Sequence, residues 1–312
     1  MDQLYNDLKT FGQVKTNTSF SKLTTFQIGG PAQYLIKVTE NDKLIRLLNY
    51  LSGEGIKYFV LGGGSNLLMP DEGIEGVTIK IETNKIETAN HNIIAQAGAQ
   101  LGTIVSVALK NHLSGLEWAV GIPGTIGGAV RGNAGAMGLD IAHSISQVEV
   151  WRDGEIITIS KTDCEFGYRE SIFKYNNSVI LRAWFELKLG AKKEILDKIQ
   201  GYMKQRSGRY PQFPSAGSFF KNIKMNKWPG DQNELPEIFR TRGTVPVGWI
   251  IEQLNLKGLK VGGAKISQEH GNFVINFHEA KQTDVLKLVE TVKEKAYNKF
   301  RVELEPEVEI IT

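Results

Sequence analysis

The sequence predicts an α+β fold, in which strands and helices mix without the strict strand–helix–strand alternation of a doubly wound sheet. Three observations favour this class. An amphipathic helix at residues 41–51 is followed by a short strand at 58–61, a hairpin pattern occupies residues 148–159, and a long apolar strand spans residues 179–189. A chain of 312 residues is long enough for two domains with separate cores.

The first elements follow from the spacing of apolar residues. Residues 20–36 predict a turn and then a strand. Two helices are expected next, one at Asn41–Leu51 with Gly53 placed to stop it and one at Leu101–Leu113. Their apolar faces consist of Leu44, Leu47, Leu48 and Leu51 in one helix and Ile104, Val105, Ala108 and Leu109 in the other. Between the two helices, the aromatic and aliphatic residues of Tyr58–Leu61 predict a short strand.

A hairpin and a change of composition follow. Asp153-Gly154 lies between the apolar runs Val148–Trp151 and Ile156–Ile159, which is a strong hairpin signal. After the strand Val179–Leu189 the chain becomes helical and basic from Lys192 to Arg209. We therefore expect one domain at residues 1–190, with its core at about 20–190, and a second at 191–312.

The second domain is expected to contain a long helix and a terminal strand. The helix Thr283–Phe300 has one apolar stripe, formed by Val285, Leu288, Val289, Val292 and Ala296. The strand is expected at Val302–Ile311. A polar, turn-rich insertion occupies Ile223–Gly243.

Composition excludes several classes of function. Hydrophobic residues make up 41% and charged residues 23%, and the net charge is only +3, so no basic stripe for nucleic acid is expected. The N-terminus lacks the pattern of a signal peptide and no apolar run reaches transmembrane length, which predicts a cytoplasmic protein without a membrane partner. Cys164 is the single cysteine, and Asp163 and Glu165 disfavour its thiolate, so we expect a buried side chain and no metal site.

A glycine-rich loop follows the strand Tyr58–Leu61. Gly62-Gly63-Gly64-Ser65-Asn66 leads into Leu67 and Leu68. Three consecutive glycines allow backbone N–H groups to approach an anion closely, such as the pyrophosphate of a dinucleotide, although an ordinary flexible loop is the alternative. The loop is not a Rossmann fingerprint, because Leu67 stands where the third glycine would fall, and no P-loop lysine follows.

A second glycine-rich segment, Gly121–Gly138, contains seven glycines in eighteen positions. It has no strand alternation or helical stripe and almost no charge, yet it interleaves Ile, Val and Met in a way that linkers do not. We expect it to be a buried loop packed against a large planar or phosphorylated ligand.

These two segments together resemble the flavin-binding domain of the vanillyl-alcohol-oxidase type (PCMH type). Three further motifs are similar to the MurB family of UDP-N-acetylenolpyruvoylglucosamine reductases: Gly167–Lys174, Pro214–Asn222 and Leu304–Val308. The resemblance covers residues 20–312 and implies an FAD-binding domain followed by a smaller α+β substrate domain. The 49 residues from Arg169 to Ser218 resemble the compact form of the family, which lacks an extra loop carrying a tyrosine.

The resemblance implies non-covalent FAD, NADPH as hydride donor and a nucleotide-sugar substrate, in a protein expected to be a monomer. Neither histidine nor cysteine stands in the first loop, so no covalent flavin link is expected there. The candidate cofactor-binding residues are Leu61, Gly62, Gly63, Gly64, Ser65, Asn66, Leu67, Gly121, Ile122, Pro123, Gly124, Thr125, Gly127, Gly128, Asn133, Ala134 and Gly135.

Three residues are candidates for catalysis. By pattern alone, Arg169 is salt-bridged or faces a ligand anion, Ser218 is a turn residue, and Glu307 is on a solvated strand face. The resemblance implies instead that Arg169 lies near the substrate carboxylate and the developing enolate. It also implies that Ser218 donates a proton to C2 of the substrate, and that the carboxyl group of Glu307 helps stabilise the enol intermediate.

Tyr168, Arg209, Asn222 and His270 are candidate contacts to the substrate phosphates or sugar, although a lone histidine is more often structural. The resulting hypothesis is a reductase of UDP-N-acetylglucosamine enolpyruvate that makes UDP-N-acetylmuramate for peptidoglycan. Two alternatives remain open. One is a sugar or hydroxy-acid oxidase on the same flavin domain, and the other is a non-catalytic nucleotide-sugar-binding protein.

Overall fold

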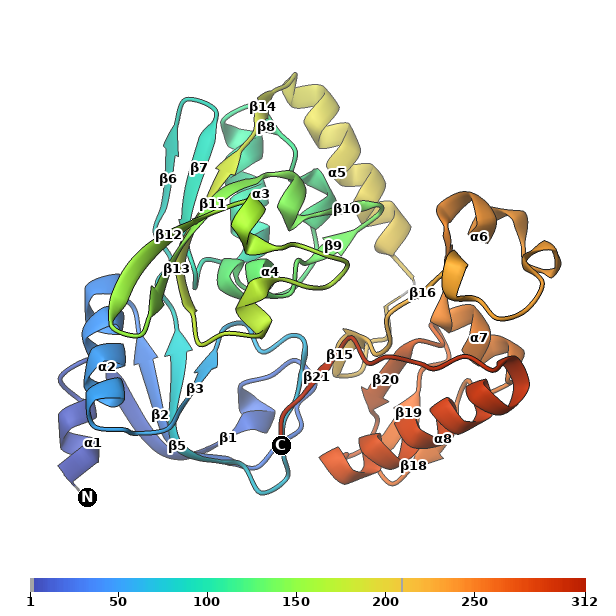
Figure 1. Cartoon of the computed structure of the whole chain (residues 1–312), viewed down its shortest axis with the longest axis horizontal. Helices are drawn as coiled ribbons and strands as arrows, with labels where there is room; N and C mark the ends of the chain where they lie inside the picture. Colours follow the sequence, from blue (N-terminus) through green and yellow to red (C-terminus); the bar gives the residue numbers. More distant parts are fainter. Residues whose placement is uncertain (1–2, 209) are drawn as a thin grey trace. The chain divides into compact units, whose positions relative to one another are not determined.

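The computed structural model describes residues 3–208 and 210–312. The chain forms two compact units, and it passes from one to the other five times, after Thr18, Pro31, Gly63, Gly73 and Ser207. The first unit comprises Met1–Thr18, Ala32–Gly63 and Ile74–Ser207, and the second comprises Ser19–Pro31, Gly64–Gly73 and Gly208–Thr312. Strands and helices are mixed in both, which confirms the α+β class (Figure 1).

This division differs from the expected boundary at residues 190 and 191. Helix α5 (Lys192–Arg206) belongs to the first unit, where Ile195 and Ile199 join the core. Two early segments belong to the second unit because Phe26, Ile28 and Leu68 lie in its core. Sequence order alone could not show that these short pieces leave the first core.

One sheet of the first unit has four strands in the order β1-β2-β5-β3, with β2 and β3 both parallel to β5. The strands are β1 (Gln13–Ser19), β2 (Pro31–Val38), β3 (Tyr58–Leu61) and β5 (Ile74–Ile81). Helices α1 (Gln3–Leu8) and α2 (Asn41–Gly53) lie beside this sheet (Figure 1). All four predicted leucines of α2 are fully buried, which confirms the predicted apolar face.

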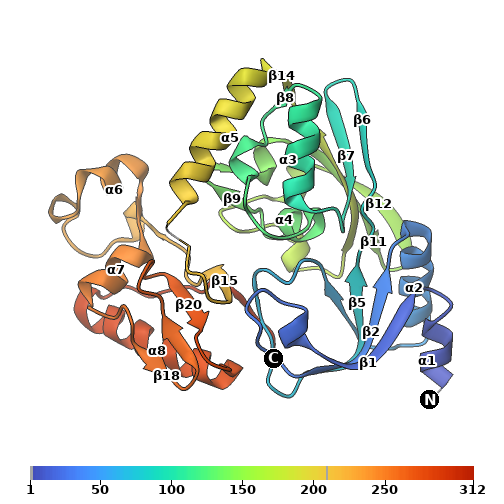
Figure 2. The same ribbon diagram turned by 180° about the vertical axis from the view of Figure 1, so that it is seen from behind.

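The other sheet of the first unit is antiparallel, with five strands in the order β12-β11-β13-β7-β6. Helices α3 (Leu101–Lys110) and α4 (Ile126–Arg131) pack against it, and α5 runs beside α3 (Figure 2). The strands are β6 (Ile86–Ala89), β7 (Asn92–Gln96), β11 (Ile145–Arg152), β12 (Glu155–Ser160) and β13 (Val179–Glu186). Short pairs join β8 (Leu113–Ser114) to β14 (Lys188–Leu189) and β9 (Gly135–Ala136) to β10 (Leu139–Asp140).

The second unit is built on a four-stranded sheet in the order β15-β20-β19-β18. Its strands are β15 (Ser215–Ser218), β18 (Lys260–Val261), β19 (Ala264–Ile266) and β20 (Phe273–Asn276). The helices are α6 (Glu237–Arg242), α7 (Val247–Gln253) and α8 (Gln282–Phe300), and the apolar stripe of α8 is buried as predicted. Two-stranded pairs join β16 (Ile223–Lys224) to β17 (Thr244–Val245) and β4 (Leu67–Leu68) to β21 (Glu309–Ile310).

Several predicted elements need correction at their ends. The second predicted helix stops at Lys110, and α2 ends at Gly53, two residues beyond the predicted Leu51. The strand expected at Val179–Leu189 is broken between β13 and β14. The strand expected at Val302–Ile311 was wrong, because only Glu309–Ile310 is in a strand. The predicted alternation of apolar side chains is still seen in the burial of this segment, because Val302, Leu304 and Val308 are buried.

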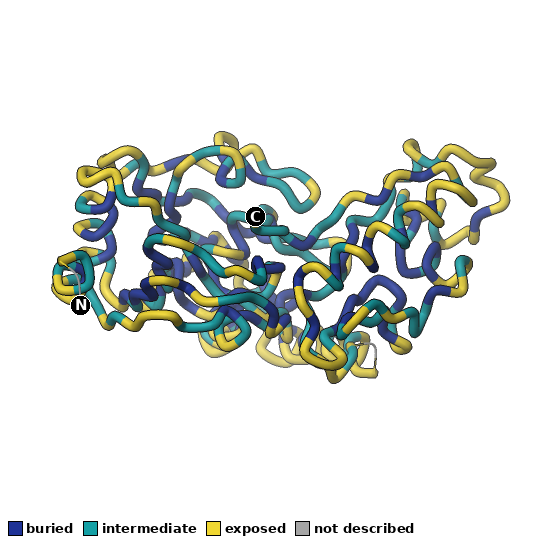
Figure 3. The backbone as a smooth tube through the Cα atoms, turned by 90° about the horizontal axis from the view of Figure 1, so that it is seen from below, coloured by how far each residue is buried: buried dark blue, intermediate teal, exposed yellow. Residues whose placement is uncertain are grey.

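The hairpin at Asp153-Gly154 is confirmed. Strands β11 and β12 are antiparallel, and Asp153 and Gly154 have φ values of 50° and 91°, as a two-residue hairpin turn with both central φ angles positive requires. Many buried residues of each unit lie along these regular elements, and connecting segments such as residues 116–119 are buried as well (Figure 3).

The insertion Ile223–Gly243 is held to the second unit by aromatic side chains. The ring centroids of Trp228 and Phe239 lie 6.3 and 5.6 Å from that of Trp249 in α7, and Trp228 also lies 5.7 Å from Phe300 in α8. The insertion is therefore an anchored part of this unit.

Candidate functional site

The two predicted glycine-rich segments meet in the first unit. A Cβ atom added to Gly63 would lie 2.7 Å from the Cα atom of Gly124, and one added to Gly62 would lie 2.6 Å from Oγ1 of Thr125. Both distances are shorter than any ordinary carbon contact, so side chains are excluded where the loops cross. The buried Leu61 ends β3 just before this crossing.

Thr125 carries an unsatisfied polar group at the crossing. It is 3% exposed, and Oγ1 is buried without a hydrogen-bond partner. Such a group costs free energy unless something donates to it or accepts from it. The glycine cradle and this orphaned hydroxyl fit a bound polar cofactor. Gly121 and Gly124, with φ values of 73° and 125°, give the loop a backbone path that other residues rarely adopt.

Other members of the second segment are engaged within the unit. The N–H groups of Ile126 and Gly127 donate to the carbonyl oxygens of Ala99 and Ala97, at 2.9 and 2.8 Å. A Cβ atom on Gly127 would lie 3.1 Å from Cβ of Ala97, so a side chain at residue 127 would force Ala97 to shift. Ile122 and Pro123 lie in the loop before α4, and Gly128 lies within that helix. The prediction of a continuous loop over this segment was therefore wrong, because Ile126–Arg131 is helical.

Asn133 organises the end of this segment. It is 2% exposed, and its amide nitrogen donates to Oδ2 of Asp140 at 3.1 Å and to the carbonyl oxygen of Gly167 at 2.7 Å. Its side-chain oxygen accepts from the N–H of Ala142. The side chain thus ties the loop to the Gly167–Lys174 motif, and the adjacent Ala134 and Gly135 follow it into β9.

Arg169 occupies a tight turn of that motif. Gly167 and Glu170 exchange backbone hydrogen bonds of 3.0 and 3.1 Å, and Arg169 has a φ of 59°, a conformation that costs a non-glycine residue roughly 1–2 kcal/mol. Its guanidinium lies 5.0 Å from the centroid of the Tyr168 ring, and Nη2 donates to the carbonyl oxygen of Gly135 at 2.7 Å. The predicted catalytic arginine is therefore tied directly to a residue of the predicted cofactor segment.

The rest of the first loop belongs to the second unit. Gly64 has a φ of 66°, its carbonyl accepts from the N–H of Thr25 at 3.0 Å, and an added Cβ would lie 2.5 Å from the carbonyl oxygen of Leu23. Ser65 and the exposed Asn66 follow, and Leu67 begins β4. The side-chain nitrogen of Asn66 donates to the carbonyl oxygen of Glu307 at 3.0 Å.

Ser218 and Glu307 are brought together by backbone pairing in the second unit. Ser218 ends β15 and lies opposite Phe273 of β20. The next residue, Phe219, accepts a hydrogen bond of 2.7 Å from the N–H of Glu307. Further along, Lys221 pairs with Glu305 through both backbone and side chain. Two segments that are distant in sequence thus hold both predicted catalytic residues on neighbouring stretches of backbone.

Asn272 was missed by the sequence reasoning. It is 3% exposed, and its side chain exchanges two hydrogen bonds with the backbone of Phe220, at 3.0 and 2.8 Å. Its carbonyl oxygen also accepts from the N–H of Phe219 at 2.7 Å. Asn272 therefore fixes the backbone just after Ser218. No sequence signal marked it, because one asparagine after a glycine is typical of any turn.

The predicted substrate contacts are distributed between the units. Tyr168 is 38% exposed in the first unit. In the second unit, Oδ1 of Asn222 accepts from the N–H of Val247 at 3.2 Å and so caps α7. Nδ1 of His270 accepts from the N–H of Asn272 at 3.1 Å, which leaves the ring proton on Nε2. Arg209 lies outside the described residues.

Lys80 is a second residue that the sequence reasoning missed. It lies in β5, and Nζ donates to the carbonyl oxygen of Gly62 at 2.7 Å. Burial lowers the pKa of Lys80, and the nearby Lys37 lowers it further, whereas Glu82 raises it. A lysine within the apolar run Val77–Ile81 was the available signal.

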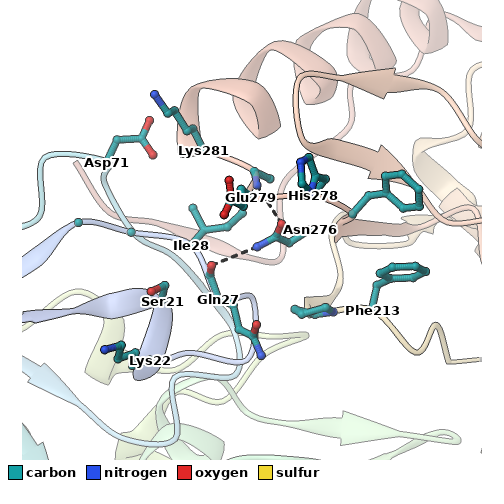
Figure 4. A pocket seen from close by; sticks show the side chains of 15 residues that line it. Ser21, Lys22, Gln27, Ile28, Asp71, Phe213, Asn276, His278, Glu279 and Lys281 are labelled. Atoms are coloured by element: carbon teal, nitrogen blue, oxygen red, sulfur yellow. Dashed lines mark hydrogen bonds between the residues drawn. The ribbon is translucent and has the colours of Figure 1, made fainter.

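A pocket of about 850 Å³ lies in the second unit, between the turn at Gln27 and the start of α8 (Figure 4). The side-chain nitrogen of Asn276 donates to the carbonyl oxygen of Gln27 at 3.1 Å, and its side-chain oxygen accepts from the N–H of Ala280 at 2.9 Å. These two hydrogen bonds join three of the residues that line the pocket. None of the predicted site residues that the structure describes lines this pocket.

Cys164 is fully buried, as predicted. Burial and the neighbouring Asp163 raise the pKa of its thiol to about 12. Within residues 3–208 and 210–312, no three His, Cys, Asp or Glu residues lie together in a way that could hold a metal ion. Over the same residues, no helix combines the length and the apolar character needed to cross a membrane.

Comparison with known proteins accounts for both units. Residues 32–160 match the family described as FAD binding domain, and residues 209–311 match the family described as UDP-N-acetylenolpyruvoylglucosamine reductase, C-terminal domain. The chain is 38% identical to UDP-N-acetylenolpyruvoylglucosamine reductase from Caldanaerobacter subterraneus subsp. tengcongensis, over 100% of this chain and 97% of the relative. It is also 38% identical to the Clostridium tetani enzyme of that name, over 99% and 96% of the two chains.

A solved structure agrees with these relatives. The crystal structure of UDP-N-acetylenolpyruvylglucosamine reductase (MurB) from Thermus caldophilus is 34% identical and has a TM-score of 0.78. The match covers 96% of this chain and 99% of that one. Full-length identity, both domain matches and the shared fold agree, and the chain belongs to the UDP-N-acetylenolpyruvoylglucosamine reductase family, with an FAD-binding domain.

Proposed function

We propose that the chain is an FAD-dependent reductase that uses NADPH to convert UDP-N-acetylglucosamine enolpyruvate to UDP-N-acetylmuramate for peptidoglycan synthesis. The names of its relatives support the reaction, and the match to an FAD-binding domain supports the cofactor. We further propose that it acts in the cytoplasm as a monomer.

The structural observation that best supports this proposal is the placement of Glu307 near Ser218. The hydrogen bond from the N–H of Glu307 to the carbonyl oxygen of Phe219 brings a carboxyl group beside the residue that follows Ser218. A hydroxyl and a carboxyl group supported by neighbouring backbone segments are suited to proton transfer and to stabilising charge on one small substrate. Asn272 adds rigidity by fixing the backbone on the other side of Phe219.

The side chains have separate roles in this proposal. When bound, FAD would supply the redox chemistry that links NADPH to reduction of the enolpyruvyl group at C3. Ser218 donates a proton at C2, and Glu307 stabilises the enol form. Arg169, whose backbone is held in a strained turn, presents a permanent positive charge to the substrate carboxylate.

The remaining predicted contacts complete the proposal. The crossing glycines and the Thr125 hydroxyl hold FAD without a covalent bond, as the buried unsatisfied oxygen supports. Tyr168, Arg209, Asn222 and His270 contact the phosphates or the sugar of the substrate.

Absorption spectroscopy under anaerobic conditions tests the function. The purified protein is expected to be yellow, to lose its flavin absorbance on addition of NADPH, and to regain it on addition of UDP-N-acetylglucosamine enolpyruvate. Acid or heat denaturation should release the flavin. Rapid reoxidation by oxygen with a simple alcohol or sugar as reductant would indicate an oxidase instead. A colourless protein that binds the nucleotide sugar but not FAD would indicate a binding protein.

A further inference from the structure

Lys80 lies directly beneath the first glycine loop. In the parallel sheet of the first unit it is in register with Leu61 on β3 and with Lys37 on β2. Its Nζ reaches past the end of β3 and donates to the carbonyl oxygen of Gly62 at 2.7 Å. A strand residue thus contacts the backbone at the point where the two cofactor segments cross.

The electrostatic setting of Lys80 is unfavourable without a ligand. The side chain is half-buried, and the like-charged Lys37 lies on the neighbouring strand. Glu82 is the nearby carboxylate, but it is bridged to Lys37 at 3.1 Å. In the part of the chain that the structure describes, no carboxylate pairs directly with Lys80. A partly desolvated cation without a counter-ion is costly, and a bound anion would offset that cost.

The hydrogen bond also fixes the direction of a backbone donor. In a trans peptide the carbonyl oxygen and the following N–H point in opposite directions. Because Lys80 holds the carbonyl of Gly62, the N–H of Gly63 is directed away from Lys80. The positive charge of Lys80 offsets the negative, carbonyl end of that peptide dipole. The positive N–H end on the opposite side of the loop is then the end that favours an anion.

A purely structural role is the alternative explanation. A lysine could simply satisfy the carbonyl of Gly62, as any donor would. Water or a neutral polar side chain could supply that hydrogen bond without burying a charge, whereas only a cation provides the long-range attraction to a phosphate. The two explanations differ in which ligands would be affected by its removal.

We propose that Lys80 is a positioning residue for the cofactor loop, which it holds with the Gly63 N–H presented to the pyrophosphate of FAD while its charge attracts that anion. The inference rests on the proposed function, because FAD is the ligand. It assigns to one lysine both the loop geometry and a part of the affinity for phosphate.

The test compares Lys80→Met with Lys80→Arg and with Lys43→Met. The methionine variant removes the donor and the charge at nearly constant volume, and the arginine variant keeps both. Lys43 is a matched control because it is a cation of α2 in the same unit, paired with Glu40, and its ion pair lies outside the glycine segments. Apo-proteins are titrated calorimetrically with FAD, with ADP as a pyrophosphate probe and with riboflavin as a probe without phosphate.

Lys80→Met should weaken both FAD and ADP binding by about 10-fold or more, the usual effect of losing a hydrogen bond that involves a charge. Riboflavin binding should be unchanged, Lys80→Arg should recover most of the loss, and Lys43→Met should bind all three ligands like the wild type. The melting temperature of the apo-protein should not fall in Lys80→Met, because a desolvated charge has been removed.

Three results would overturn the proposal. FAD and ADP could bind Lys80→Met as tightly as the wild type, riboflavin could weaken equally with ADP, or Lys80→Arg could bind as poorly as Lys80→Met. In each case a wild type that still binds FAD leaves the proposed function intact. If the wild type itself failed to bind FAD, the proposed function would fall, and this inference with it.

Discussion

The side-chain amide of Asn66 donates a hydrogen bond of 3.0 Å to the backbone carbonyl of Glu307, and the N–H of Glu309 returns one of 3.0 Å to the carbonyl of Asn66. A residue of the first glycine loop therefore holds the backbone of a predicted catalytic residue 241 positions later. Both lie in the second unit, so this end of the loop helps to hold the backbone of that unit.

Replacing Asn66 with alanine tests this relationship. The backbone N–H groups of the loop remain, so FAD affinity should change little, whereas Glu307 loses its tether. We expect the free energy of unfolding to fall by about 1 kcal/mol, the usual net value of one hydrogen bond. Reoxidation by the enolpyruvyl substrate should slow several-fold in stopped-flow measurements, with NADPH reduction unaffected. A variant that loses FAD before it loses reoxidation would show that the amide serves the cofactor instead.

Replacing Ser218 with alanine should separate the two half-reactions. If Ser218 donates the proton at C2, flavin reduction by NADPH should stay nearly intact, and reoxidation should fall by about 100- to 10,000-fold. Ser218→Cys should retain part of the rate, because a thiol can deliver a proton from almost the same place. Ser215→Ala, on the same strand, is the matched control. Equal slowing of both steps in Ser218→Ala would mean that the serine is structural.

Replacing Gly63 with alanine should abolish FAD binding, because the new Cβ atom would lie 2.7 Å from the backbone of Gly124 and force the two segments apart. Gly102→Ala is the control. It lies in α3, nothing lies within 4 Å of its added Cβ, and it should raise the free energy of unfolding by about 1 kcal/mol without affecting FAD. Normal FAD binding in Gly63→Ala would show that the crossing is a structural turn.

The thiol of Cys164 should resist alkylation in the native protein. Its pKa is raised to about 12, chiefly by burial, so almost no thiolate exists at pH 8. Iodoacetamide should therefore label the unfolded protein once and the folded protein hardly at all, as mass spectrometry would show. The folded pKa exceeds the unfolded value of about 8.5, so the contribution of this thiol to stability is complete below pH 8.5 and is lost as the pH rises toward 12. Rapid labelling of the native protein at pH 8 would contradict this burial.

Periodic and conformationally special residues were predictable from the sequence. The leucines of α2, the stripe of α8 and the Asp153-Gly154 turn each reflect a local rule that the structure confirms. The glycines at 62 and 63 were expected to allow a close approach of the backbone to an anion. The structure shows that Gly124 and Thr125 of the second glycine-rich segment approach them closely.

What escaped prediction depends on partners distant in sequence. Asn272 clamps Phe220 from 52 positions away, and Lys80 is 18 positions from the carbonyl that it contacts. Neither pairing has a local pattern, because each requires knowledge of which strands are neighbours. The predicted terminal strand failed for a similar reason, since residues 302–308 alternate like a strand but only Glu309 and Ile310 pair with a neighbouring strand, β4.

The five passages of the chain between its units have a consequence for synthesis on the ribosome. The last residue of the first unit is Ser207, so that unit is complete in sequence about two-thirds of the way through translation. The second unit must wait for its final residues, because β4 at Leu67 pairs with β21 at Glu309. Until then Phe26, Ile28 and Leu68 lack their core. Contacts of such long range form slowly, so we expect these apolar segments to stay exposed in the newly made chain until Glu309 and Ile310 have been synthesised.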